Sequence, residues 1–257
     1  MLTAFAVSDI GLKRTTNEDA FLSDLDLGLF CVADGLGGHN AGEVAARLSL
    51  DAIAGFVRRT RDTEDVSWPF GVDRELSFDG NRLVTAVKLA NQSVFLNANL
   101  HEDRFGMGTT IVAALVTGRR ATYVSVGDSR IYSFRHGRLS KLTTDDSLSS
   151  VRLRHLHHGP LDAVESDGMR HVLTKAVGPS REISVPVSER DLAPDEILLL
   201  SSDGLHGFVD DAMIETILRT HRSLEGAARQ LVQTALELGG TDNATAVLLR
   251  HDADASA

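Results

Sequence analysis

The segment LFCVADGLGGHNAGE, residues 29–43, passes from an apolar run into a carboxylate and then into a glycine-rich stretch. The apolar run is short and ends at Asp34, followed by glycine, which is typical of a strand. Apolar residues at helical spacing begin after the glycines and continue to Arg59. The segment therefore predicts a strand over 27–33, an irregular stretch over 34–42 and a helix over 43–59.

Three other aspartates stand beside apolar, strand-like runs. Asp128 and Asp203 each follow such a run, and Asp242 comes just before one. In an antiparallel sheet the end of one strand lies beside the start of its neighbour, so these carboxylates and Asp34 are expected at one rim. Crowded carboxylates need a cation, and sets of oxygen ligands suit Mg²⁺ or Mn²⁺. Each aspartate taken alone also fits an ordinary turn, because Asp-Gly and Asp-Asn are turn dipeptides.

The other periodicities predict strands and helices in separate blocks, which indicates an α+β fold of two packed antiparallel sheets flanked by helices. Residues 60–80 and 143–169 show no clear period and are interpreted as excursions. Without a repeat or a linker, residues 1–251 are expected to form a single domain, with a frayed tail at 252–257. Strands are expected at 3–7, 19–22, 110–116, 121–126, 130–134, 139–142, 197–202 and 244–249, and helices at 81–100, 211–220 and 223–238.

Composition limits the function classes. The chain has 257 residues, a formal net charge of −10 and one cysteine, Cys31. The acidic balance argues against nucleic-acid binding, which usually needs a basic patch. No apolar run reaches the roughly 18 residues of a membrane helix, and the N-terminus lacks the features of a signal peptide. We therefore expect a cytoplasmic protein without disulfides that binds neither nucleic acid nor membrane.

A second dense segment, SDIGLKRTTNED at residues 8–19, places Arg14 close to Glu18 and Asp19. A guanidinium suits bidentate capture of a phosphate, and the two carboxylates suit a metal or its water. A surface salt bridge is the alternative interpretation. The glycine-rich stretch matches neither phosphate-binding glycine motif, so a nucleotide site is poorly supported. Its first glycine, Gly35, would instead let a backbone carbonyl approach a cation.

These segments belong to an ordered set of motifs that spans nearly the whole chain. The set is SDIGLKRTTNED at 8–19, VADGLGGHNAGE at 32–43, GMGTT at 106–110, VGDSR at 126–130, VLTKAVG at 172–178, SSDG at 201–204 and TDNAT at 241–245. In this order the motifs resemble those of the metal-dependent serine/threonine protein phosphatases, the PPM or type 2C family, in its compact bacterial form.

The resemblance implies an α-β-β-α sandwich, in which two antiparallel sheets are flanked by pairs of helices and a metal centre lies at one end. Two Mn²⁺ or Mg²⁺ ions would occupy the centre, and a third ion would bind more weakly beside them. The implied metal set is Asp34 as the bridging ligand, the Gly35 carbonyl, Asp203, Asp242 and Glu18 or Asp19, with Asp128 and Asp203 for the third ion.

The resemblance also implies the reaction. Arg14 would bind the substrate phosphate, His39 occupies the position of the family's proposed general acid, and Asp19 would support the catalytic centre. The expected activity is hydrolysis of phosphoserine and phosphothreonine in proteins by water activated between two cations. The expected partners are phosphoproteins and an opposing serine/threonine kinase, and the enzyme is expected to be a monomer.

Two other function classes stay open: a metallophosphatase for small phosphoesters, and a regulatory domain that binds phosphoproteins without catalysis. The family pattern is not followed everywhere. Asp146 stands where bacterial relatives usually have histidine, and the flap that follows it is shortened and rich in His and Arg. An insertion surrounds Trp68. The flap residues His155, His157 and His158 would suit zinc, but no other soft ligands accompany them.

Overall fold

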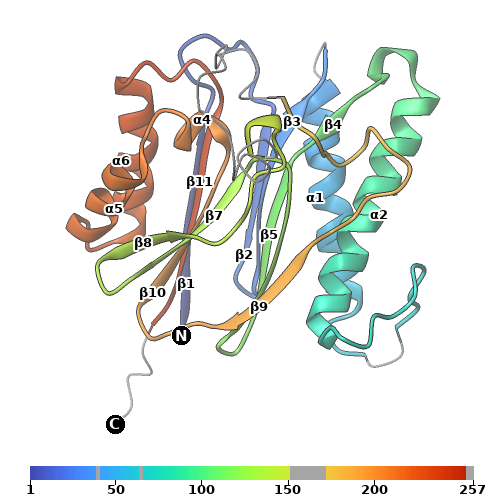
Figure 1. Ribbon diagram of the computed structural model, residues 1–257, viewed down its shortest axis with the longest axis horizontal. Helices are drawn as coiled ribbons and strands as arrows, with labels where there is room; N and C mark the ends of the chain where they lie inside the picture. Colours follow the sequence, from blue (N-terminus) through green and yellow to red (C-terminus); the bar gives the residue numbers. More distant parts are fainter. Residues whose placement is uncertain (39–40, 64–65, 151–171, 253–257) are drawn as a thin grey trace, which may run out of the picture.

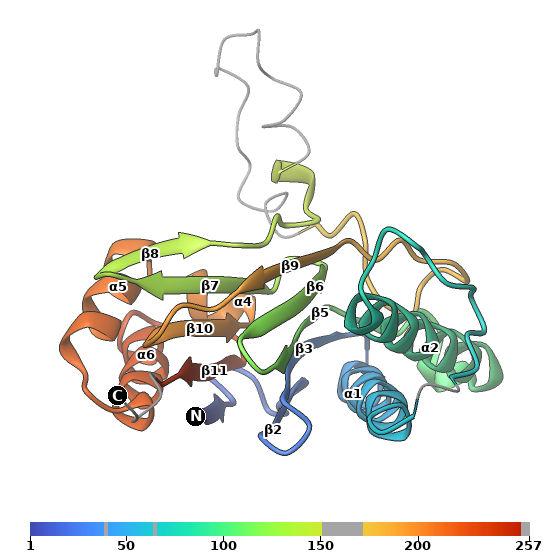
Figure 2. The same ribbon diagram turned by 90° about the horizontal axis from the view of Figure 1, so that it is seen from below.

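The computed structural model describes residues 1–38, 41–63, 66–150 and 172–252. These residues form two antiparallel sheets that pack face to face, with a pair of long helices on each outer side (Figure 1). Seen from below, the four layers (helices, sheet, sheet, helices) follow one another across the molecule (Figure 2). The α+β sandwich expected from the sequence is confirmed.

One sheet has the order β1-β11-β10-β7-β8, and the other has the order β2-β3-β5-β6-β9 with β4 paired to β3. The first sheet consists of β1 (Leu2–Asp9), β11 (Ala244–His251), β10 (Glu196–Ser201), β7 (Arg130–Arg135) and β8 (Arg138–Lys141). The second consists of β2 (Asp19–Asp24), β3 (Leu29–Leu36), β4 (Gly108–Thr109), β5 (Ile111–Thr117), β6 (Arg120–Val126) and β9 (Val187–Asp191).

Two helices cover the outer face of each sheet. The second sheet carries α1 (Ala41–Arg59) and α2 (Phe78–Leu100), and the first carries α5 (Asp211–Thr220) and α6 (Leu224–Glu237). Two short helices, η1 (Glu102–Arg104) and α4 (Asp203–His206), join these elements. None of the helices in the described part of the chain is long and apolar enough to cross a membrane.

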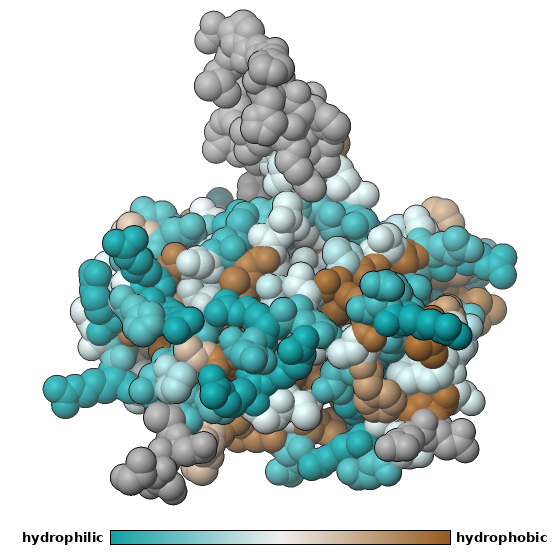
Figure 3. Space-filling view, turned by 60° about the horizontal axis from the view of Figure 1, so that its bottom comes forward, coloured by the Kyte–Doolittle hydropathy of each residue, from teal (hydrophilic) through white to brown (hydrophobic). Residues whose placement is uncertain are grey.

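The apolar core lies in three layers, and the strands explain the continuous apolar runs in the sequence. Phe30 and Val32 of β3 face the other sheet, whereas Leu29 and Cys31 face α1 and α2. A strand buried on both faces is apolar at every position rather than at alternate ones. Outside the core, hydrophilic side chains cover most of the face shown in Figure 3, with apolar residues between them.

The expected element positions hold within a few residues, with two informative differences. Residues 34–36 belong to β3, so the prediction of irregular structure from 34 was wrong there. Gly35 pairs with Thr109 of β4, and a Cβ on it would lie 2.2 Å from the Gly42 carbonyl oxygen. The polar strand β9 was not predicted, because an edge strand with half-exposed residues lacks an apolar period.

Leu198→Ala is expected to lower the free energy of unfolding by about 2–5 kcal/mol, because it opens a cavity between the two sheets. Leu198 is 0% exposed and packs in that inner layer. Urea denaturation measures the change. Leu25→Ala is the matched control, since Leu25 is 49% exposed and its truncation costs little. Equal losses in the two variants would contradict this assignment of the core.

Candidate metal centre

Five aspartates from separate elements meet at one end of the sandwich. Asp19 of β2 and Asp34 of β3 are direct cross-strand partners. Asp203 begins α4 directly after β10, Asp242 precedes β11, and Asp128 follows β6. The negative charges of the other four all act on the Asp34 carboxylate. The convergence expected from antiparallel strand ends is therefore present in the fold.

The surrounding protein changes the acidity of this cluster. Asp34 keeps a small accessible surface at the rim, but its enclosure raises the pKa of its carboxyl well above the usual value. Repulsion from neighbouring carboxylates, Asp19 first, adds to the rise. Burial likewise raises the pKa of Asp19 to about 7, although hydrogen bonds from Ser202 and Thr245 oppose the shift. The cluster thus favours a proton or a cation.

The hydrogen bonds of Asp19 test whether a cation fits. Its Oδ2 accepts from the Ser202 hydroxyl at 2.7 Å and from the Thr245 hydroxyl at 2.6 Å. Its Oδ1 is buried and accepts no hydrogen bond. A buried carboxylate oxygen without a donor costs free energy, and a hard cation would supply the missing partner. The donor set therefore fits a divalent ion.

Arg14 lies over the same cluster. Its Nη2 donates to Asp242 Oδ2 at 2.8 Å, and its Nη1 stands 4.0 Å from Glu18 Oε2. The side chain is 48% exposed, so its guanidinium reaches solvent as well as the carboxylates. The hydrogen bond that Arg14 donates to Asp242 is the main cause that raises the pKa of Arg14. Arg14, the residue expected to bind phosphate, thus lies at the rim of the acidic cluster.

Glu18 and Gly35 are packed together at the start of α1. The Gly35 N–H donates to the Glu18 carbonyl at 3.2 Å, and Glu18 Oε1 lies where a Cβ on Gly42 would be 2.9 Å away. Burial raises the pKa of Glu18, while the positive charge of Arg14 opposes the rise. The backbones of Gly35 and Gly42 approach each other so closely that both positions require glycine.

In the ranges that the structure describes, no three acidic, histidine or cysteine side chains stand close enough to form a complete ligand set. The engagement of Asp242 with Arg14 is one physical reason, and mutual repulsion of the carboxylates is another. Ion binding would require these carboxylates to draw together.

Residues that the sequence reasoning did not single out hold the cluster in place. Asn243 donates from Nδ2 to the carbonyls of Ile10 and Thr16, and its Oδ1 accepts from the Glu18 N–H at 2.8 Å. One side chain therefore fixes the first motif against the last. Ser202 and Thr245 likewise hold Asp19 in place, through the hydrogen bonds that their hydroxyls donate to it. Their places inside the SSDG and TDNAT motifs were the available signal.

The remaining expected residues have different outcomes. Asp128 follows Gly127, whose φ of 101° is readily adopted only by glycine. The charge of Asp128 acts on the Asp34 carboxylate. His39 lies outside the described residues, as do His155, His157 and His158 of the flap. The proposed general acid is therefore not placed.

A family model described as protein phosphatase 2C matches residues 13–238, which is most of the chain. The chain belongs to the protein phosphatase 2C family. A putative protein phosphatase 2C-type from Streptococcus pyogenes is 30% identical over 253 residues, which cover 96% of each chain. The serine/threonine protein phosphatase PstP of Mycobacterium tuberculosis is 34% identical over 243 residues. That match covers 95% of this chain but 44% of PstP.

Solved structures agree with the sequence relatives. The crystal structure of M. tuberculosis PstP/Ppp has a TM-score of 0.83 at 32% identity and covers 98% of this chain and 99% of its own. The PstP catalytic domain in complex with two manganese ions has a TM-score of 0.81 at 31% identity, with the same coverage. Stp1 from Staphylococcus aureus has a TM-score of 0.83 at 30% identity and covers 98% and 96%.

In chelator, the melting temperature is expected to fall as pH rises from about 4 to about 7. The raised pKa of Asp34 adds to the fall. The folded protein keeps the Asp19 proton up to a pKa of about 7, whereas the unfolded chain loses it near its ordinary, lower pKa. Stability is therefore lost across that window. Calorimetry of wild type and Asp19→Asn measures it, and the variant should show a smaller fall.

Asp62→Asn is the control for this measurement, since the Asp62 side chain is 92% exposed. It should reproduce the wild-type profile. A melting temperature that rises across the window, or the same fall in Asp19→Asn, would contradict the expected titration.

Proposed function

We propose that this chain is a metal-dependent phosphatase that hydrolyses phosphoserine and phosphothreonine in proteins. The observation that carries the proposal is the cluster of five aspartates, in which the buried Oδ1 of Asp19 accepts no hydrogen bond and Asp242 pairs with the half-exposed Arg14. The names of the relatives support the same reaction and the use of manganese.

The proposed ions and ligands are those that the family pattern implies, and the convergence of the five aspartates at one rim supports them. The ions are Mn²⁺ or Mg²⁺, two in the core of the site and a third bound more weakly. When bound, such ions lower the pKa of a water and neutralise charge on a phosphoryl group. The proposed ligands are Asp34, the Gly35 carbonyl, Asp203, Asp242 and Glu18 or Asp19 for the core, with Asp128 and Asp203 for the third ion.

The protein's own groups bind and orient the substrate. The Arg14 guanidinium carries five N–H donors in a planar fork, of which the contact with Asp242 uses one. The others are available to a phosphate, whose charge they stabilise as it reacts. Ser202 and Thr245 keep the Asp19 carboxylate in one orientation. His39 is proposed as the general acid for the departing alkoxide on the family pattern alone.

The other classes are less well supported. A silent phosphoprotein-binding domain would not need the aspartate cluster, which is intact here. A small-phosphoester phosphatase would use the same ions and the same arginine, so only substrate comparison separates it. We propose that residues 1–251 act as one catalytic domain. Pairing with a serine/threonine kinase, a monomeric state and a cytoplasmic location stay predictions from the sequence.

Hydrolysis of a phosphothreonine peptide is expected to stop in EDTA and to return with Mn²⁺. Asp34→Asn and Asp242→Asn should not recover activity, because each removes a charge from the proposed ligand set. Asp51→Asn, an exposed aspartate of α1, is the control. Released phosphate measures turnover, and circular dichroism checks the fold. Full turnover in EDTA with no metal by elemental analysis would refute the mechanism, and preference for sugar phosphates would favour the small-phosphoester class.

Arg14→Ala is expected to raise KM for the phosphopeptide more than it lowers kcat, because Arg14 binds the phosphate already in the ground state. Arg14→Lys should lie between the variant and wild type, since a point charge replaces the fork. Steady-state kinetics measure both constants, with the exposed neighbour Lys13→Ala as the control. An unchanged KM with kcat reduced about a thousandfold would assign Arg14 to the transition state instead.

A further inference from the structure

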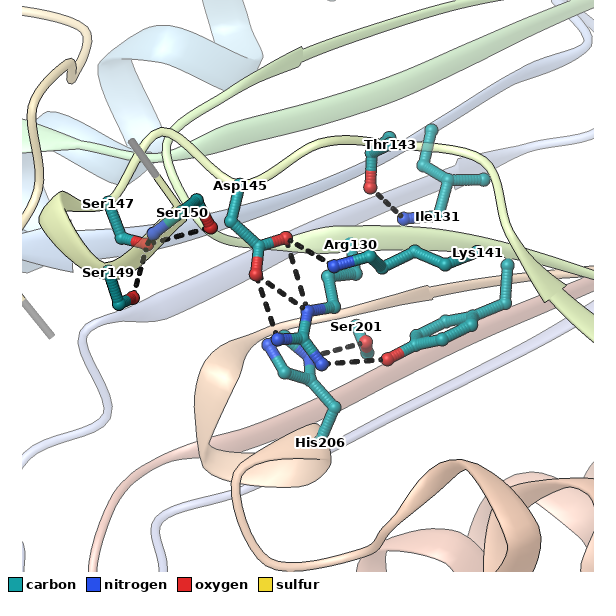
Figure 4. Close-up of polar contacts among 11 residues, drawn as sticks. Arg130, Ile131, Lys141, Thr143, Asp145, Ser147, Ser149, Ser150, Ser201 and His206 are labelled. Carbon is teal, nitrogen blue, oxygen red and sulfur yellow. Dashed lines mark hydrogen bonds and ion pairs between the residues drawn. The ribbon is translucent and has the colours of Figure 1, made fainter. Parts of the chain in front are cut away.

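Two consecutive aspartates, Asp145 and Asp146, follow the β7–β8 hairpin shortly before residues 151–171. Asp145 accepts from Arg130 Nη2 at 2.8 Å and from Lys141 Nζ at 3.2 Å (Figure 4). Burial tends to lower the pKa of Arg130, but its bonds to Asp145 prevail and raise it. Arg130 is the second residue after Asp128, so Asp145 fixes the chain on that side of the proposed ligand.

Asp146 fixes the other side. Its N–H donates to the Gly127 carbonyl at 2.8 Å, and its Oδ2 accepts from the Gly127 N–H at 3.3 Å. Its Oδ1 pairs with Lys175 Nζ at 3.3 Å, and its carbonyl accepts from the Thr174 N–H at 2.8 Å. Asp146 therefore joins the turn before Asp128 to residues 172–178, which we call the returning chain.

The returning chain also reaches the strand that carries Asp34. Ser147 forms an antiparallel bridge with Leu173, and Thr109 of β4 forms another with Val177. Since β4 pairs with β3 at Gly35, the returning chain is connected through β4 to the strand that carries Asp34 and through Asp146 to the turn before Asp128. The Asp146–Lys175 contact lies at the junction of these connections.

We propose that Asp146 and Lys175 are a positioning pair for the phosphatase reaction proposed above. The pair holds the Asp128 turn and the returning chain in one arrangement beside the metal centre. The side chains are 18% and 31% exposed, so solvent screens their attraction less than on an open surface. This rests on the proposed function, and neither residue is assigned a contact with the reacting atoms.

The charges allow position and electrostatics to be separated. Asp146→Asn removes a negative charge beside the centre, and Lys175→Met removes a positive one. If the residues acted only through charge, the two variants would shift KM for a dianionic phosphopeptide, and the affinity for Mn²⁺, in opposite directions. If they act through position, both variants weaken the binding of the substrate and the binding of Mn²⁺.

The experiment measures KM and kcat on a phosphothreonine peptide and follows Mn²⁺ binding by electron paramagnetic resonance of the free ion. Both single variants should raise KM by about threefold to tenfold, with a smaller change in kcat, and weaken the lowest-affinity Mn²⁺ site. The double variant should resemble a single one, because the partners share one interaction. Lys175→Arg, which keeps the positive charge, should retain KM and Mn²⁺ binding close to those of the wild type.

Arg58→Met is the control, since Arg58 pairs with Asp24 at a similar distance, 3.2 Å, at the opposite end of β2 from Asp19. It should leave KM and Mn²⁺ binding unchanged. Opposite shifts in the two single variants, wild-type values in both, or an equal loss in Arg58→Met would each overturn the proposal. If the wild type does not hydrolyse the peptide, the proposed function fails, and Mn²⁺ binding alone decides the positioning pair.

Discussion

Repulsion among carboxylates at one rim of the sandwich is the constraint on which the rest of the site depends. Asp19 and Asp34 face each other across two paired strands, and three more aspartates lie near them. Such crowding is unfavourable in a closed environment unless a cation balances it. The fold tolerates it because the Ser202 and Thr245 hydroxyls and Asn243 hold the surrounding chain, and ion binding would then draw the carboxylates together.

The sequence was most informative where chemistry and chain direction coincide. Aspartates at strand ends predicted a shared rim, and seven ordered motifs predicted the family. The extension of β3 through Leu36 was not predicted, because glycine fits turns and close strand packing equally well. The role of Asn243 depends on contacts with residues more than 220 positions away, which spacing along the chain does not reveal.

The layered core restrains the strands that lead into the site, in addition to the hydrogen bonds at the site itself. Strands buried on both faces leave little freedom for the residues at their ends, so β3, β10 and β11 deliver their aspartates from fixed directions. Asp145 and Asp146 extend this rigidity to the Asp128 turn, which follows the end of β6.

The two ends of the described chain are joined far from this chemistry. The Asp252 N–H donates to the Met1 carbonyl at 2.8 Å, and β1 runs from that point towards the rim, ending at Asp9. A tether attached there would hold the protein by the pole opposite its aspartates. Immobilised on a bead or biosensor chip through such a tether, the protein would present its aspartate rim outward to any phosphoprotein passed over the surface.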